Sequence, residues 1–382
     1  MKNRRRDRPL PASRVSGLLS DLLLDVPLAR GQGDAAVLLH TLERAVRLTP
    51  VFADALTPVD GWLAEAEALA RDPLQPRTLA RLTIRMAEVH MRRGQLATAL
   101  QALADAETQA PVMDEEERTW LRATRARVWV RQQRLADAAR ELETLDAASW
   151  RVLVAVGELA LESGDLPRAR DTFSRTLSAL PWQQVEERIA GQQSLAFIAL
   201  VRGEPVVAVR HLEAALDGLR AVAYWPEVIA TSVTLGGLHT ALGHRGVAQR
   251  LFAQARELSE RHPSPPWEAF GQMGVARLNA LQGRTDAAVQ AALDAARRLA
   301  RQGSLVGYVG MLVFVARLHT DAGQHDQAYR TLATGVAIAK HRAWPQVERL
   351  LREKIDHLRN EVMGPADFDA MVQRLLDEAH SA

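Results

Sequence analysis

Three histidines recur at one position of a repeated sequence pattern: His90, His239 and His319. Imidazole is a common zinc ligand, so these residues are the first candidates for metal chemistry. A metal site requires two of them to share one coordination sphere. Stacked helix pairs hold equivalent positions about 10 Å apart, and these histidines are at least two copies apart. We therefore expect histidines of the core or of a groove, with no metal bound.

The residues that catalysis requires are not arranged for it. The chain of 382 residues contains no cysteine, which excludes disulfides and cysteine nucleophiles. It has no phosphate loop of the type G-x-x-x-x-G-K, no H-E-x-x-H zinc motif and no G-x-S-x-G nucleophile elbow. We expect no catalytic residue and no cofactor, and hence no enzyme. A hydrolase or transferase is the least favoured alternative.

The repeated pattern is a helix-turn-helix unit, numbered here so that the turn residue is place 15. Place 15 is Gly94, Gln133, Gly164, Gly203, Gly243, Gly283 and Gly323. Place 8 is Ala87, Ala126, Gly157, Ala196, Gly236, Ala276 and Ala316, and place 20 is Ala99, Ala138, Ala169, Ala208, Ala248, Ala288 and Ala328. Two antiparallel helices approach closely only where their side chains are small. These places therefore predict where the two helices of each unit cross.

The spacing of the copies predicts the helix lengths. Successive place-20 alanines are 39, 31, 39, 40, 40 and 40 residues apart. After two turns are subtracted from a 40-residue period, each helix has roughly 15 to 18 residues. One unit is short.

These residues resemble the tetratricopeptide-repeat (TPR) family, in the long-repeat form of MalT-like regulators. The resemblance covers about residues 80–343 and rests on motifs such as Leu235, Gly236, Gly243, Ala248, Phe252 and Ala255 in the fifth copy, and Met86, Ala87, Gly94, Ala99, Leu103, Ala106 and Pro111 in the first. It implies an all-α fold, a right-handed α-solenoid of about seven to eight helix hairpins with capping helices at both ends. The motifs specify a fold rather than a function.

The sequence divides into four predicted parts. Residues 1–14 form a basic tail that is too polar to fold, residues 15–79 a helical cap with a degenerate repeat, residues 80–343 seven repeats, and residues 344–382 a capping hairpin. The alternative for the tail is a weak electrostatic contact with acidic lipid, nucleic acid or protein.

In the TPR family the first helices line the concave face through places 2, 5, 9 and 12. The candidate partner-binding residues are Phe197, Phe270, Met273, Arg277, Val313 and Arg317. An apolar lining of this kind suits an apolar helix or peptide. The alternative is that the protein's own terminal helices fill the groove.

The charge at place 9 changes along the array. Glu88 and Glu158 stand there in early copies, and Arg277 and Arg317 in the last two. We expect a groove whose two ends differ in sign. The neighbouring arginines would receive an acidic group of the partner or pair internally with an acid such as Asp321.

The sequence therefore predicts a non-enzymatic scaffold or adaptor that binds a protein or peptide partner. The alternative is a sensory or regulatory module that binds a small ligand or peptide. A net charge of +2 with a pI near 9.3 reflects arginine-rich composition, so no specific nucleic-acid binding is expected. No apolar run reaches the ~18 residues of a membrane span. The absence of cysteine suits the cytoplasm.

Overall fold

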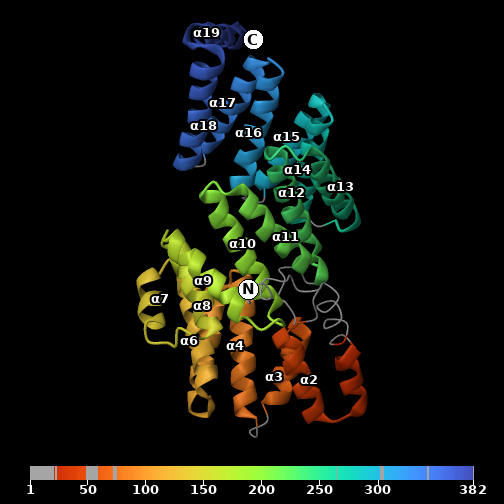
Figure 1. The fold of residues 1–382 in the computed structure, drawn as a ribbon, viewed down its shortest axis with the longest axis vertical. Coiled ribbons are helices and arrows are strands. Elements are labelled where there is room, and N and C mark those ends of the chain that lie inside the picture. The colour runs from red at the N-terminus through yellow and green to blue at the C-terminus, as the bar shows by residue number, and fades with distance from the viewer. Residues whose placement is uncertain are drawn as a thin grey trace, which may run out of the picture. The chain divides into compact units, whose positions relative to one another are not determined.

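The computed structural model describes residues 21, 24–48, 59–71, 75–263, 265–301, 305–341 and 344–381. Helices and turns make up this part of the chain, and it contains no strand (Figure 1). The predicted basic tail lies outside the described residues. The chain divides into two compact units, Met1–Tyr224 and Trp225–Ala382, called unit 1 and unit 2 below.

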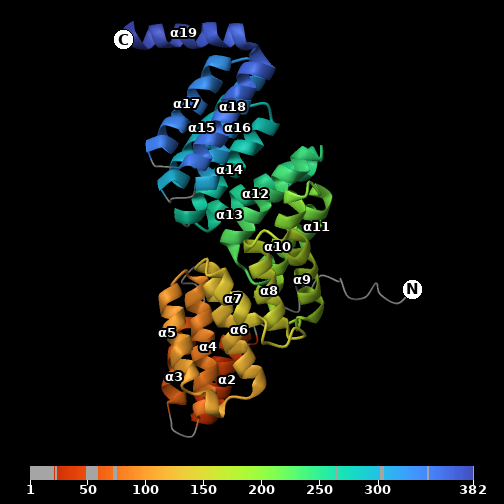
Figure 2. The same ribbon diagram turned by 90° about the vertical axis from the view of Figure 1, so that its left-hand side faces the viewer.

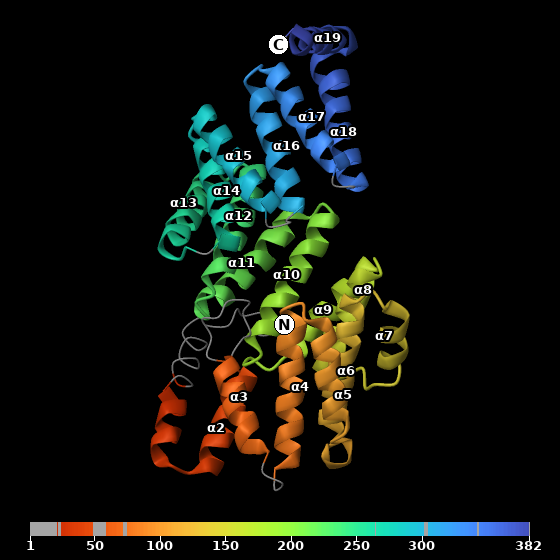
Figure 3. The ribbon, with the colours of Figure 1, turned by 180° about the vertical axis from the view of Figure 1, so that it is seen from behind.

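Unit 1 is a series of helix pairs in which consecutive helices pack side by side (Figures 1 and 3). Its helices are α2 (Ala35–Leu48), α3 (Val59–Ala70), α4 (Pro76–Arg92), α5 (Leu96–Glu107), α6 (Glu115–Arg131), α7 (Leu135–Leu142), α8 (Trp150–Glu162), α9 (Leu166–Ala179), α10 (Val185–Val201) and α11 (Pro205–Ala221), with a short 3-10 turn at Ala110–Val112. The short repeat interval corresponds to α7, which has only 8 residues.

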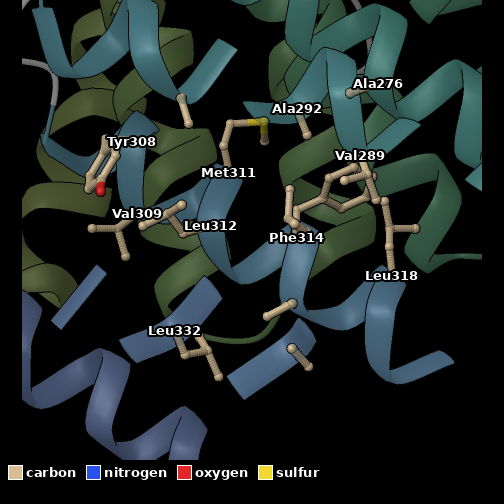
Figure 4. Close-up of a cluster of buried hydrophobic side chains, with 14 of the residues drawn as sticks. Ala276, Val289, Ala292, Tyr308, Val309, Met311, Leu312, Phe314, Leu318 and Leu332 are labelled. Carbon is tan, nitrogen blue, oxygen red and sulfur yellow. The ribbon is translucent and has the colours of Figure 1, made fainter. Parts of the chain in front are cut away.

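Unit 2 continues the same pattern with longer and more regular helices. They are α12 (Trp225–Ala241), α13 (Arg245–Arg261), α14 (Pro265–Leu281), α15 (Thr285–Arg301), α16 (Leu305–Asp321), α17 (His325–His341), α18 (Pro345–His357) and α19 (Pro365–Ser381). Each of α12 to α17 has 17 residues, within the predicted range. Helices α14 to α19 share one apolar core, part of which Figure 4 shows around Met311, Leu312 and Phe314.

The small residues lie where the helices cross, as predicted. All seven place-20 alanines are 0% exposed. Place 8 is closed as well, and its two glycines each face a phenylalanine at place 24. A Cβ atom added to Gly157 would lie 2.9 Å from the Phe173 ring, and one added to Gly236 would lie 2.5 Å from the Phe252 ring. A larger partner across the hairpin therefore demands the smallest residue at place 8.

The turns confirm the role of place 15. In all seven copies the N–H of place 16 donates to the carbonyl of place 11 at 2.8–3.0 Å, and the N–H of place 15 to that of place 12 at 2.9–3.1 Å. This is the Schellman motif, which requires a left-handed residue after the helix. Gln133 adopts that conformation with φ 61°, so the copy without glycine makes the same turn.

The C-terminal segment differs from the expected capping hairpin. A π-helical turn, Leu358–Met363, joins α18 to Gly364, whose φ of 86° and ψ of 146° are not those of a hairpin turn. In consequence α19 lies across the end of the preceding helices rather than antiparallel to α18 (Figure 2). Phe368 of α19 packs edge-on against Tyr329 of α17, with ring centroids 5.4 Å apart. The four-part division of the chain stays a prediction.

Candidate functional site

The first helices of the successive hairpins carry the predicted site, and in each unit they are called the first-helix face below. In unit 2 it is made by α12, α14 and α16, and five of the six predicted site residues lie there. Met273 of α14 and Val313 of α16 are partly buried against the core of unit 2. The predicted apolar lining is therefore partly buried in the core. Phe270, at the start of α14, is half-buried as well.

Arg277 is the most unusual residue of this face. Its guanidinium lies 5.3 Å from the ring centre of Phe314, which is only 9% exposed. Its Nε is sealed from solvent and makes no hydrogen bond, and none of the described acids forms an ion pair with it. Burial, and after it the positive charge of Arg317, lower the pKa of Arg277. The site thus holds a cation whose charge the described residues leave uncompensated, a costly arrangement in a partly desolvated place.

Arg317 behaves differently, although it occupies the same repeat place. Its side chain is 67% exposed, and its Nε lies 3.9 Å from Asp321, which is equally exposed. Exposed pairs of this kind contribute about 0–1 kcal/mol. Pairing with an acid of the same protein is therefore weak for Arg317, and Arg277 has no such pair among the described residues.

Gly237 completes the row of place-9 residues in unit 2. A Cβ atom added to it would lie 3.2 Å from Nη1 of Arg277. The missing side chain leaves room for the guanidinium above Phe314. Sequence reasoning did not single out either Gly237 or Phe314, although a glycine at place 9 between larger residues is a visible signal.

The sixth predicted residue, Phe197, lies on α10 in unit 1. It is 53% exposed, and Val201, one helical turn later, is 54% exposed. The described geometry of unit 2 therefore brings together only five of the six predicted residues.

The first-helix face of unit 1 carries buried ion pairs at place 9. Arg127 donates from Nε and Nη2 to both carboxylate oxygens of Glu158, at 3.0 and 2.9 Å. Glu88 accepts from Arg85 at 2.7 Å and from the Trp120 indole at 2.8 Å. Burial alone would raise the pKa of Glu88, but these partners hold it below its ordinary value.

The start of α10 covers part of this face. Glu186 and Glu187 lie 3.1 and 3.2 Å from nitrogens of Arg92 on α4. The start of α10 therefore contacts α4 within unit 1, and filling of the groove by the terminal helices stays an alternative. The expectation of an acidic end is wrong for Glu88 and Glu158, because arginines of the same unit neutralise both.

No protein-family model and no curated protein matches the chain. Solved structures do. A Rap protein complexed with Competence and Sporulation Factor has a TM-score of 0.57 at 13% identity, over 78% of this chain and 86% of that one. The apo form of the quorum sensor NprR from B. thuringiensis has a TM-score of 0.55 at 14% identity, over 75% and 83%.

A third structure, a STAND protein with a tetratricopeptide-repeat sensor from Pyrococcus horikoshii, has a TM-score of 0.55 at 14% identity. It covers 91% of this chain and 56% of that one. At such identities the likeness concerns the fold alone. The fold of the chain is an all-α solenoid like that of these TPR proteins.

The TPR turns also explain the three recurring histidines. At place 11, Nδ1 of His90 and of His319 lies 2.7 and 2.8 Å from the amide oxygen of the glutamine at place 16. His239 pairs in the same way with His244, at 3.1 Å. Each histidine thus links the two ends of its own turn through this side-chain contact. No group of three metal-ligating side chains occurs in the described part of the solenoid, and none of its helices is long and apolar enough to cross a bilayer.

Proposed function

We propose that this protein is a non-enzymatic TPR scaffold that binds a protein segment or peptide on the first-helix face of unit 2. The observation that carries the proposal is Arg277, a partly buried guanidinium without an acidic partner among the described residues. A second arginine beside it adds repulsion. An acidic group of a partner would offset both charges, and the planar fork of arginine suits a carboxylate.

The surroundings of Arg277 favour a partner that is also apolar. Phe314 lies beneath the guanidinium, and Met273 and Val313 are only partly covered by the core. Charged groups on low-dielectric surroundings interact more strongly than on an open surface. We infer a partner segment that presents a carboxylate next to one or two apolar side chains.

The structural neighbours support a binding role without assigning a partner. One of them is NprR in complex with its cognate peptide NprX, with a TM-score of 0.52 at 11% identity. The shared fold makes peptide binding a reasonable function for this face. An adaptor, which holds a protein, and a sensory module, which responds to a peptide or small ligand, would both use it.

The experiment compares variants in affinity capture from the native cell, followed by calorimetric titration of the partner recovered. Arg277→Met with Arg317→Met is expected to weaken binding by more than the ~1 kcal/mol typical of rim charges. The matched control is Arg297→Met with Arg301→Met, which removes two exposed charges from α15, a second helix.

Equal affinity of wild type and the Arg277/Arg317 variant would remove this face from consideration. Equal losses in both double variants would mean that only net charge matters. A co-purifying protein favours the adaptor, whereas a bound metabolite in native mass spectrometry favours the sensor. A cytoplasmic location and the absence of a specific nucleic-acid partner stay predictions.

A further inference from the structure

Unit 1 contains a cavity of about 160 Å³ at the start of its first helices. At roughly 30 Å³ per water molecule, it has room for a small organic molecule. Its wall comes from α2, α4, α6 and α8 and carries four arginines and four acids, among them Arg77, Arg81, Arg151, Glu116 and Glu117. Four helices of one unit thus supply a densely charged pocket.

Most acids of this pocket are already engaged. Glu117 accepts from Arg77 at 2.7 Å and from Arg81 at 3.2 Å, and it also closes a capping box with Asp114. Asp114 pairs in turn with Arg77, and Glu43 lies 2.6 Å from Arg81. The lining has four arginines and four acids, so its charges balance, and release of one acid from its arginine would leave one positive charge to be neutralised.

Among the arginines of this cavity, Arg151 has the fewest acidic partners. Its guanidinium carbon lies 5.1 Å from the ring centre of Trp120 and 4.4 Å from that of Trp150, so two indoles flank it. The side chain is 13% exposed, and its Nε is enclosed without a hydrogen-bond partner. Within the described residues its one acidic partner is Glu116, at 2.9 Å, whose side chain is 76% exposed.

The pair of Arg151 and Glu116 is therefore unequal. Arg151 is held in place by two rings, whereas Glu116 reaches it from solvent and is free to leave. Exposed carboxylates gain little from such a contact, because side-chain entropy and solvent screening oppose it. A ligand oxyanion could take the place of Glu116 at little cost.

We propose that this cavity binds a compact carboxylate-bearing small molecule, with Arg151 as the anchor and Glu116 as an internal competitor. The ligand carboxylate replaces that of Glu116 on Arg151, and Arg77 and Arg81, each paired with an acid, line the rest of the cavity. A carboxylate fits the planar fork of a guanidinium, and the two nearby indoles limit the movement of Arg151. This site belongs to unit 1 and does not depend on the partner-binding face of unit 2.

The test is calorimetric titration of the full chain with succinate as the probe, in a buffer without competing carboxylates. Arg151→Gln is expected to weaken succinate binding by at least about tenfold, because it removes the anchoring charge. Glu116→Gln is expected to tighten binding by about threefold, because it removes the competitor. A merely structural ion pair would give no such gain.

Two controls make the result decisive. Glu115→Gln removes the same charge from the neighbouring residue, which is 82% exposed, pairs with Arg118 and does not line the cavity. It should leave succinate affinity unchanged, as should Arg277→Met in unit 2. If Arg151→Gln does not fold, the comparison of Glu116→Gln with Glu115→Gln still decides.

Three outcomes would overturn the proposal. The first is no heat of binding with millimolar succinate for either wild type or Glu116→Gln. The second is an equal gain in Glu115→Gln and Glu116→Gln, which would be a general charge effect. The third is binding of inorganic phosphate but not of succinate, which would exclude the carboxylate class.

Discussion

The charged residues at place 9 of the repeat are neutralised in unit 1 but not in unit 2. In unit 1 this place holds Arg127, which is 4% exposed and binds both oxygens of Glu158. In unit 2 it holds Arg277, which is partly buried among apolar side chains. Its charged neighbour is Arg317 rather than an acid. In unit 1, place-9 side chains of alternating charge neutralise one another. In unit 2, the two place-9 arginines carry the same charge, which stays uncompensated.

The difference teaches that a repeat place determines position but not partner. Successive copies bring place-9 residues next to each other, so the sign of each neighbour decides whether a charge is neutralised. A buried charge with a partner is costly to disturb, whereas a buried charge without one is a burden on stability. Such a burden suggests selection for binding rather than for stability.

The largest effect is expected from the same substitution made in both units. Arg127→Met would remove the bidentate partner of Glu158, whose side chain is 21% exposed, and leave only the more distant charges of Arg131 and Arg92. The expected cost is about 2–3 kcal/mol of unfolding free energy, below that of a fully buried pair. Arg277→Met strands no acid and should be neutral or slightly stabilising. Urea titration measures both variants, and hydrogen exchange should locate the loss of protection in α6 and α8. A comparable loss in Arg277→Met would mean that Arg277 has an internal partner after all.

An intermediate effect is expected at the helix crossings. Gly236→Ala forces the Phe252 ring to move, since the new Cβ would lie 2.5 Å from it. Overpacking costs about 1–3 kcal/mol, against a gain of at most ~1 kcal/mol in helix propensity. Gly157→Ala in unit 1, with its wider 2.9 Å spacing to Phe173, should cost less.

The double variant Gly236→Ala with Phe252→Leu should recover part of the loss, because the added methyl group fills space that the smaller side chain vacates. The control is Gly237→Ala, one residue along α12, which meets only the flexible end of Arg277. Thermal midpoints compare the variants. Strictly additive effects of Gly236→Ala and Phe252→Leu would rule out the proposed contact between them.

The smallest effect concerns the turns. Unit 2 has glycine at its three repeat turns and unit 1 at three of four, with Gln133 at φ 61° in the remaining one. Ala223, between α11 and α12, is also left-handed, at φ 54°. Ala223→Gly should stabilise the chain by about 1 kcal/mol, because the strain of a Cβ in this conformation is removed. Gly243→Ala in unit 2 should destabilise it by a similar amount. A lower thermal midpoint for Ala223→Gly would contradict this account.

The amino-acid sequence determined the repeat and its local geometry. Small residues at places 8 and 20 predicted the helix crossings, and glycine at place 15 predicted the left-handed turns. These features depend on residues within one hairpin, so spacing alone reveals them. Even Gln133, which breaks the glycine pattern, follows the turn that its copy requires.

Tertiary structure alone decided which charges are neutralised. Arg127 and Glu158 are 31 residues apart, and Arg92 and Glu187 are 95 apart. Pairing over such distances depends on how successive helices rotate against one another, which periodicity does not specify. The sequence singled out the arginines at place 9 of the last copies, and their role stays a prediction. Only the packing of Arg277 onto Phe314 showed that one of them is partly buried without an acid among the described residues.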